Sequence, residues 1–138
     1  MIEKRKFVLD GPPRGQGRPR WGNGRAYKAR EDVSWESSIA AAYWRDNPRA
    51  PKYTGQVHVT IEAYLPIPQS ANRAARFDMA ANKQPALKKP DVDNVAKAVL
   101  DALNGVAWND DKQITLLIVQ KLYSDDPHLT VRLRGVSE

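Results

Sequence analysis

Hydrophobic and polar residues follow two different periods along this chain, and the changes of period mark the elements that we predict. Between residues 57 and 64 every second residue is apolar, which is typical of a half-buried β-strand. After Pro90 the apolar residues recur at spacings of three and four, as on one buried helix face: Val92, Val95, Ala96, Val99, Leu100 and Leu103. The pair Asn104-Gly105 predicts the end of that helix.

The same patterns predict five further elements. In chain order they are a short strand at 7–9, a long helix at 29–46, a short helix at 70–81, a buried strand at 114–123 and a last strand at 129–134. The main elements thus run strand, helix, strand, helix, strand, strand, which predicts an α/β fold: a mixed sheet of about four strands covered by two main helices. With 138 residues and no repeats or linker, we expect a single domain over residues 1–138.

Composition excludes several classes of protein. The chain has no Cys, which excludes disulfides, zinc ribbons and thiol chemistry. Its apolar runs fall well short of the roughly 20 residues that a membrane span needs, and the N-terminus lacks the apolar segment of a signal peptide. We therefore expect a cytoplasmic protein without a membrane partner.

Positive charge is concentrated near the N-terminus. The net charge is +6, and residues 1–30 hold nine Lys or Arg against two acidic residues. A Gly- and Pro-rich stretch at 14–28 interleaves cations with Trp21 and Tyr27, a composition suited to binding phosphates and stacking on an exposed base. The candidate DNA-binding cations here are Arg14, Arg18, Arg20, Arg25 and Lys28. A solvated basic loop is the alternative.

Acidic residues gather around the helix that follows Pro90. Asp91 and Asp93 precede or begin it, Lys97 lies one turn further in, and a second acidic pair, Asp110-Asp111, follows the helix. If the chain returns past the helix so that this pair reaches the first two aspartates, three carboxylates converge and require a cation such as Mg²⁺. The alternative is that the first pair only caps the helix.

Two blocks of sequence resemble the signature of the RusA family of Holliday junction resolvases. They are the run Lys89-Pro90-Asp91-Val92-Asp93-Asn94-Val95 with Lys97, and Leu100 to Gly105 followed by Trp108-Asn109-Asp110-Asp111-Lys112-Gln113-Ile114. A Gly-Arg-Pro-Arg core near the start, as at 17–20, also occurs in many RusA-like chains of phages. The resemblance implies a RusA-like α/β fold and a homodimeric endonuclease of bacterial or phage origin.

The resemblance also implies roles for individual residues. Asp91, Asp93 and Asp111 would carry catalysis as ligands of Mg²⁺ (or Mn²⁺), and Lys97 would assist. Asp110 matches a further acidic position of the family pattern and is an additional candidate for metal binding. The partner would be branched DNA, chiefly a four-way junction.

The segment at 66–89, directly before these aspartates in the sequence, contains a second group of cations. The candidates for DNA contact here are Arg73, Arg76, Lys88 and Lys89, with Lys83 among them. The alternative is a solvated insertion, and we expect this segment to be poorly ordered without DNA. Glu62 is a possible extra carboxylate near the site, whereas His58 and His128 receive no role.

Together these features lead to one hypothesis and two alternatives. We expect a Mg²⁺-dependent endodeoxyribonuclease that resolves four-way junctions by paired nicks. The alternatives are a non-catalytic DNA-binding module derived from such a nuclease, and a nuclease without selectivity for branches.

Overall fold

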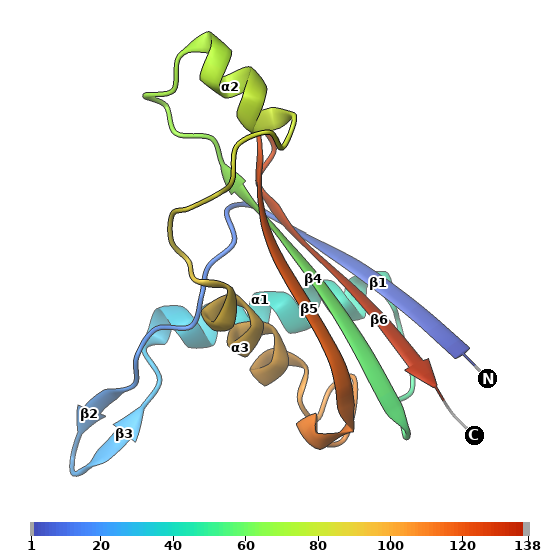
Figure 1. The fold of residues 1–138 in the computed structure, drawn as a ribbon. Coiled ribbons are helices and arrows are strands. Elements are labelled where there is room, and N and C mark those ends of the chain that lie inside the picture. The colour runs from blue at the N-terminus through green and yellow to red at the C-terminus, as the bar shows by residue number, and fades with distance from the viewer. Residues whose placement is uncertain (1, 137–138) are drawn as a thin grey trace.

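The computed structural model describes residues 2–136 and shows one four-stranded sheet with two long helices on one face (Figure 1). This confirms the predicted mixed α/β fold. In chain order the elements are β1 (Ile2–Asp10), β2 (Arg20–Gly22), β3 (Arg25–Tyr27), α1 (Arg30–Asp46), β4 (Gln56–Pro66), α2 (Arg73–Ala80), α3 (Val92–Leu103), the 3₁₀ turn η1 (Asp111–Gln113), β5 (Ile114–Ser124) and β6 (His128–Val136).

The sheet has the strand order β1-β6-β4-β5, so β1 and β5 form its two edges. β4 pairs antiparallel with β6 and parallel with β5, and β1 pairs antiparallel with β6. The parallel pair needs a long crossover, which the segment with α2 and α3 supplies. None of the helices in the described part of the chain is both long and apolar enough to cross a membrane.

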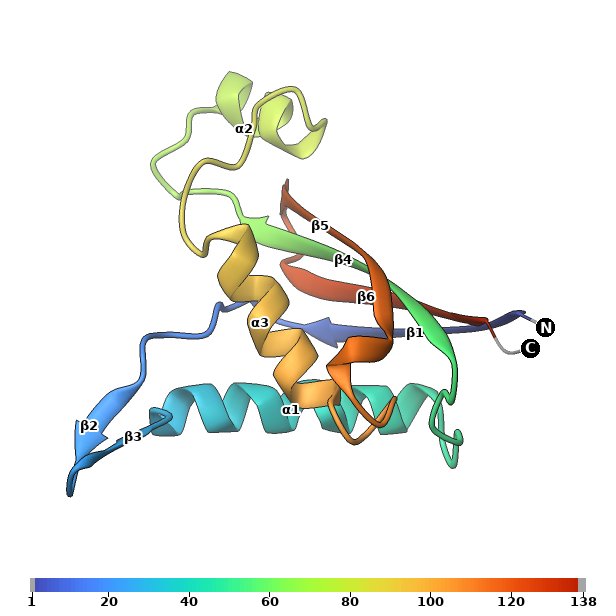
Figure 2. The ribbon, with the colours of Figure 1, turned by 60° about the horizontal axis from the view of Figure 1, so that its bottom comes forward.

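The helices α1 and α3 lie against the same face of the sheet, as Figure 2 shows. On β4 the odd-numbered residues Val57, Val59 and Ile61 are fully buried in the core shared with the helices, while even-numbered residues face the other side. The helices contribute Ile39 and Tyr43 from α1, among other residues, to this core. Within residues 2–136 the opposite face of the sheet carries no helix.

The basic stretch at 14–28 was expected to be a loop, but it contains the hairpin of β2 and β3. The turn between the strands is Asn23-Gly24, and both residues have positive φ, at 52° and 76°. An Asn-Gly pair is the sequence signal for such a tight hairpin turn. The hairpin projects away from the sheet and helices (Figures 1 and 2).

The segment at 66–89 contains the short helix α2, which begins at Arg73 rather than at Ser70. Asn72 is its N-cap, and the Asn72 side chain accepts a hydrogen bond of 2.8 Å from the Ala75 N–H. A small separate core joins this segment to β4 and β5: Leu65, Ile67, Met79, Ala86 and Tyr123. Poor order in the absence of DNA stays a prediction for this segment.

Candidate active site at the start of α3

The N-terminal end of α3 presents two carboxylates to solvent, and we call Asp91 and Asp93 the acidic end. Asp91 is the N-cap residue, with extended backbone at φ −72° and ψ 150°, and its carbonyl accepts a hydrogen bond from the Val95 N–H. Its carboxylate accepts no capping hydrogen bond. Neither aspartate forms an ion pair within residues 2–136. Both side chains are therefore available to a ligand, and exposed Lys97 follows Asp93 by about one turn.

Asp111 is held in place by a buried tryptophan. The indole N–H of Trp108 donates a hydrogen bond of 2.7 Å to Oδ1 of Asp111. Trp108 is completely buried in the main core, so the direction of this N–H is fixed. The Asp111 carboxylate is thereby oriented before any ligand binds.

Asp110 caps the 3₁₀ turn η1. Its Oδ1 accepts a hydrogen bond of 2.9 Å from the Lys112 N–H, and its own N–H donates one of 3.0 Å to Oε1 of Gln113. These bonds give Asp110 a structural task, and its role in metal binding stays a prediction.

The acidic end and Asp111 lie at opposite ends of α3 within one chain. The helix has 12 residues, which separates its ends by about 18 Å. Beyond the helix the chain folds onto the C-terminal end, where the Ala107 N–H donates to the Leu103 carbonyl at 2.9 Å. The described residues contain no group of three or more acidic, His or Cys side chains that could hold a metal ion. The predicted convergence of three carboxylates required the chain to return to the acidic end after α3. Within one chain it does not return there.

The basic loop, residues 14–28, packs against the acidic end. The Gln16 N–H donates to the Asn94 carbonyl over 3.0 Å. A Cβ on Gly15 would lie 2.8 Å from Cβ of Asn94 and 2.9 Å from Cβ of Pro90, so a side chain at position 15 has no room. The buried carboxylate of Asp32 accepts the Gly17 N–H at 3.2 Å and fixes the loop from its other side. Thus the basic and acidic motifs of the sequence are neighbours in space.

The chain matches a family model described as Endodeoxyribonuclease RusA over residues 10–134. It belongs to the RusA family. It is also similar to an uncharacterized protein, YqaN, of Bacillus subtilis (strain 168), with 35% identity over 139 residues that cover 96% of each chain. Family membership makes this RusA chain an endodeoxyribonuclease, a hydrolase of DNA phosphodiester bonds, and points to Holliday junctions as its substrate.

The metal that the RusA family implies fits the donors at the acidic end. Asp91 and Asp93 offer exposed carboxylate oxygens without protein partners among the residues described, and Mg²⁺ typically binds one or two carboxylates plus water and substrate phosphate. Gln16, whose backbone contacts Asn94, has a buried Oε1 with no hydrogen-bond partner in the described chain. The donor chemistry is that of a hard, oxygen-liganded cation.

Several cations of the RusA basic loop are already engaged by acidic residues. Arg14 lies 3.9 Å from Asp32, and Arg20 lies 3.6 Å from Glu31. Lys28 forms ion pairs of 2.9 Å with Glu36 and 3.0 Å with Asp101. Burial acts to lower the pKa of Lys28, but hydrogen bonds to Glu36 and Asp101 outweigh it and raise the pKa.

The remaining loop cations are available to a ligand. Arg18 and Arg25 are exposed and form no ion pair within the described residues. On the β2–β3 hairpin, which includes Arg25, Trp21 is 76% exposed, and Tyr27 is also exposed. A protruding hairpin with an exposed indole and flanking arginines is suited to contact bases and backbone.

The predicted DNA-binding cations of the 66–89 segment also fall into two groups, those that are exposed and those held by partners within the protein. Arg73 and Lys89 are exposed. Arg76 pairs with Asp125 at 3.7 Å, and Lys88 donates to the Pro66 carbonyl at 2.5 Å. Lys88 is therefore turned toward the protein and is poorly placed for DNA in this conformation.

The helix-free face of the RusA sheet holds cations that the sequence analysis did not assign. Lys4, Lys6, Arg132 and Arg134 line a hollow of about 500 Å³ on this face, together with His58. The alternation of residues along each strand predicts that these side chains share one face of the sheet. It does not predict which face the helices cover.

Glu62 does not lie near the acidic end. It points to the helix-free face, where it pairs with Arg132, whereas α3 covers the other face. The expectation of a further carboxylate at the site is therefore wrong for Glu62. His128 stacks on Tyr64 with 4.2 Å between ring centroids, in keeping with a structural role.

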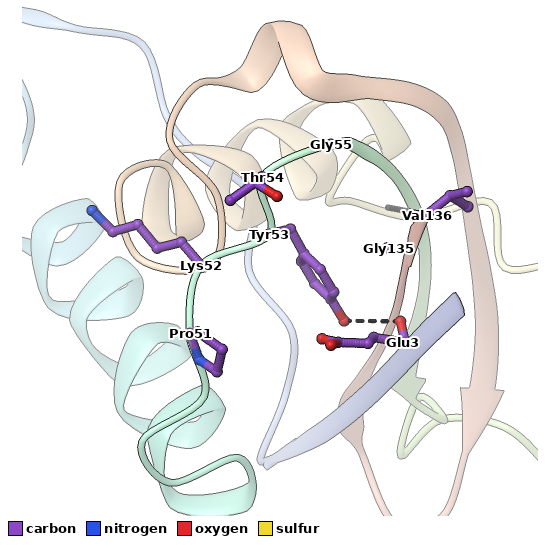
Figure 3. A pocket seen from close by; sticks show the side chains of 8 residues that line it. All are labelled: Glu3, Pro51, Lys52, Tyr53, Thr54, Gly55, Gly135 and Val136. Atoms are coloured by element: carbon purple, nitrogen blue, oxygen red, sulfur yellow. Dashed lines mark hydrogen bonds between the residues drawn. The ribbon is translucent and has the colours of Figure 1, made fainter. Parts of the chain in front are cut away.

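A separate pocket of about 250 Å³ lies where β1, β6 and the residues before β4 meet (Figure 3). The Tyr53 hydroxyl donates to the Glu3 carbonyl at 3.2 Å, and burial raises the pKa of Tyr53 to about 12. Its ring occupies the space that a Cβ on Gly135 would need, at 2.1 Å. The Tyr53 phenol is thus neutral, hydrogen-bonded and packed against Gly135, which is a structural role.

Proposed function

We propose that the protein is a Mg²⁺-dependent endonuclease, also active with Mn²⁺, that resolves four-way DNA junctions by paired nicks. One observation carries the proposal: the carboxylates of Asp91 and Asp93 are exposed and unengaged beside Lys97, at the end of α3 on which the basic loop packs. Anionic metal ligands and phosphate-binding cations are thus neighbours in a RusA chain.

Each part of the site has a proposed task. Asp91 and Asp93 bind the divalent ion, which when bound polarises the scissile phosphate and activates water for hydrolysis. The ammonium of Lys97 offsets negative charge that develops on the phosphoryl oxygens. Arg18 and Arg25 bind the DNA backbone and keep the scissile strand at the acidic end.

A non-catalytic DNA-binding module is the second candidate. It is favoured by the position of Asp111, which lies at the far end of α3 from the acidic end in a single chain. In such a module the carboxylates would bind an ion only to order the start of the helix.

Asp91→Asn separates these two functions. For the nuclease, the substitution abolishes nicking of a synthetic junction in Mg²⁺ and leaves junction affinity unchanged or higher, since a negative charge facing phosphate is removed. If the wild-type protein binds junctions in Mg²⁺ and never nicks them, the module is correct. Comparing a junction with a linear duplex of matched sequence, at one salt concentration, tests branch selectivity.

A further inference from the structure

Four cations stand in two rows on the helix-free face of the sheet, and we call them the sheet patch. Lys4 on β1 is paired with Arg134 on β6, and Lys6 is paired with Arg132. All four residues are exposed, and they line the hollow of about 500 Å³ on this face. Strand geometry places the two rows about 7 Å apart and the neighbouring strands about 5 Å apart.

The protein itself neutralises little of this charge. Glu62 forms an ion pair with Arg132. Lys4, Lys6 and Arg134 form no ion pair within residues 2–136. Like charges directly opposite one another on neighbouring strands destabilise a sheet. The sheet patch therefore breaks a rule of local stability, and such exceptions are expected at functional positions.

The sheet patch is separated from the acidic end by the sheet. Helix α3 covers the other face, as Figure 2 shows. Near the start of β5, Leu116 lines the same hollow as the patch, whereas Val119 and Leu122, further along the strand, line a hollow with Val92 at the start of α3. A ligand on the patch and a ligand at the acidic end would thus occupy different parts of the molecule.

The arrangement of the four cations favours a polyanion with regularly repeated charges. Such an array can contact several phosphates of one backbone, whereas a single carboxylate or phosphate would leave most of it without a partner. Leu116 is 46% exposed in the same hollow and offers an apolar surface to the sugars between the phosphates. The chain belongs to a family of DNA endonucleases, so the polyanion that it meets is DNA.

We propose that the sheet patch is a second DNA-binding site, which binds the backbone of a duplex on the face of the sheet opposite the acidic end. Contacts to phosphates carry no sequence information, so this site retains the protein on any duplex, including an arm of a junction. The proposal rests on membership in a family of DNA endonucleases. It requires neither metal chemistry nor the resolution of junctions.

Lysine acetylation tests the site on the unmodified protein. When a linear duplex is added at low salt without divalent metal, Lys4 and Lys6 should lose reactivity, measured by mass spectrometry. Lys52, which is exposed between α1 and β4, is the control and should stay reactive. If the duplex leaves Lys4 and Lys6 as reactive as before, the proposal is overturned. Protection of both lysines by polyglutamate but not by duplex overturns it too, and assigns the face to an acidic polypeptide.

Removal of charge measures the contribution of the patch. Lys4→Gln with Lys6→Gln should reduce the slope of log affinity against log salt for a linear duplex by about 2, because two phosphate contacts are lost. The fold should persist, since the change removes opposed like charges. The control, Arg49→Asn with Lys52→Gln, removes the same charge from exposed positions outside the patch, and Asn suits the φ of 59° at position 49. Equal slopes for the two double variants overturn the proposal.

Nicking of a junction is a separate measurement, so the two proposals can fail independently. If the wild-type protein never nicks but the duplex protects Lys4 and Lys6, the proposed function fails and the second DNA-binding site stands. If the protein nicks junctions while both lysines stay reactive on duplex, the second site is wrong and the nuclease function stands.

Discussion

Trp108 and Asp111 are joined by a hydrogen bond of 2.7 Å that links the hydrophobic core directly to a candidate metal ligand. The indole is completely buried, and its N–H has this carboxylate as its acceptor. One residue therefore serves both the folding of the chain and the orientation of a carboxylate. Such a dual role predicts that changes at Trp108 affect stability and nicking together.

Trp108→Phe should lower the free energy of unfolding by about 2–3 kcal/mol, because it removes a hydrogen bond to a charged group and leaves a small void. Nicking should fall as the Asp111 carboxylate loses its fixed orientation. Urea denaturation and junction nicking measure the two effects.

Asp111→Asn is the matched control for Trp108→Phe. Its amide oxygen still accepts from the indole, so the free energy of unfolding should change by less than about 1 kcal/mol while nicking is lost. A fully active Asp111→Asn protein would remove Asp111 from the chemistry.

Lys97→Met should reduce the nicking rate about 10²–10³-fold, the usual effect of losing one group that stabilises developing charge. The Lys97 side chain is exposed, so stability should hardly change. Lys97→Arg keeps the charge and should recover part of the rate. Single-turnover nicking with saturating protein measures this step, and equal rates for the Met and Arg variants would contradict a role for charge.

Gly15→Ala tests the packing of the basic loop on the acidic end. The new Cβ would meet Cβ of Asn94 at 2.8 Å, which forces the loop away and should cost about 1–3 kcal/mol of stability. Junction affinity and nicking should both fall because phosphate-binding cations move away from the metal ligands. Wild-type nicking by a stably folded Gly15→Ala protein would show that the loop position is irrelevant to the chemistry.

Local patterns predicted much of the fold, and the reasons lie in particular residues. The apolar face of α3 and the alternation on β4 each lie within about a dozen consecutive residues, so the period of apolar residues was enough to predict both elements. The hairpin of the basic loop was missed although Asn23-Gly24 carried its signal, because the surrounding Gly and Pro residues suggested irregular structure.

Long-range relationships could not be predicted in the same way. The position of Asp111 depends on how residues 104–108 close onto Leu103, and no period in the sequence reports that turn. The helix-free basic face depends on which face of the sheet α1 and α3 cover, and the parallel pairing of β4 with β5 depends on a distant crossover.

Arg18 and Arg25 should each contribute to the salt dependence of DNA affinity. Each is exposed and has no ion-pair partner within residues 2–136, so Ala at either position should reduce the slope of log affinity against log salt by about 1. Arg20→Ala is the comparison, since Arg20 lies near Glu31, and it should change the slope less. Junction binding measured across a salt series gives all three slopes, and unchanged slopes for both exposed arginines would place the phosphate contacts elsewhere.

Trp21 should recognise the branch point of a junction. Its indole is 76% exposed on a hairpin that projects from the body of the protein, and stacking of a base on an aromatic ring contributes about 1–3 kcal/mol. Bases at a branch point unstack more easily than bases within a duplex. Trp21→Ala should therefore weaken junction binding by about tenfold and change the affinity for linear duplex far less.

Phe77→Ala is the matched control for Trp21, because Phe77 is also an exposed aromatic residue, 68% exposed, but lies on α2. It should leave the ratio of junction to duplex affinity unchanged. Equal losses on junction and duplex for Trp21→Ala would instead assign the hairpin to general backbone binding. Branch selectivity would then have to arise from residues outside the hairpin.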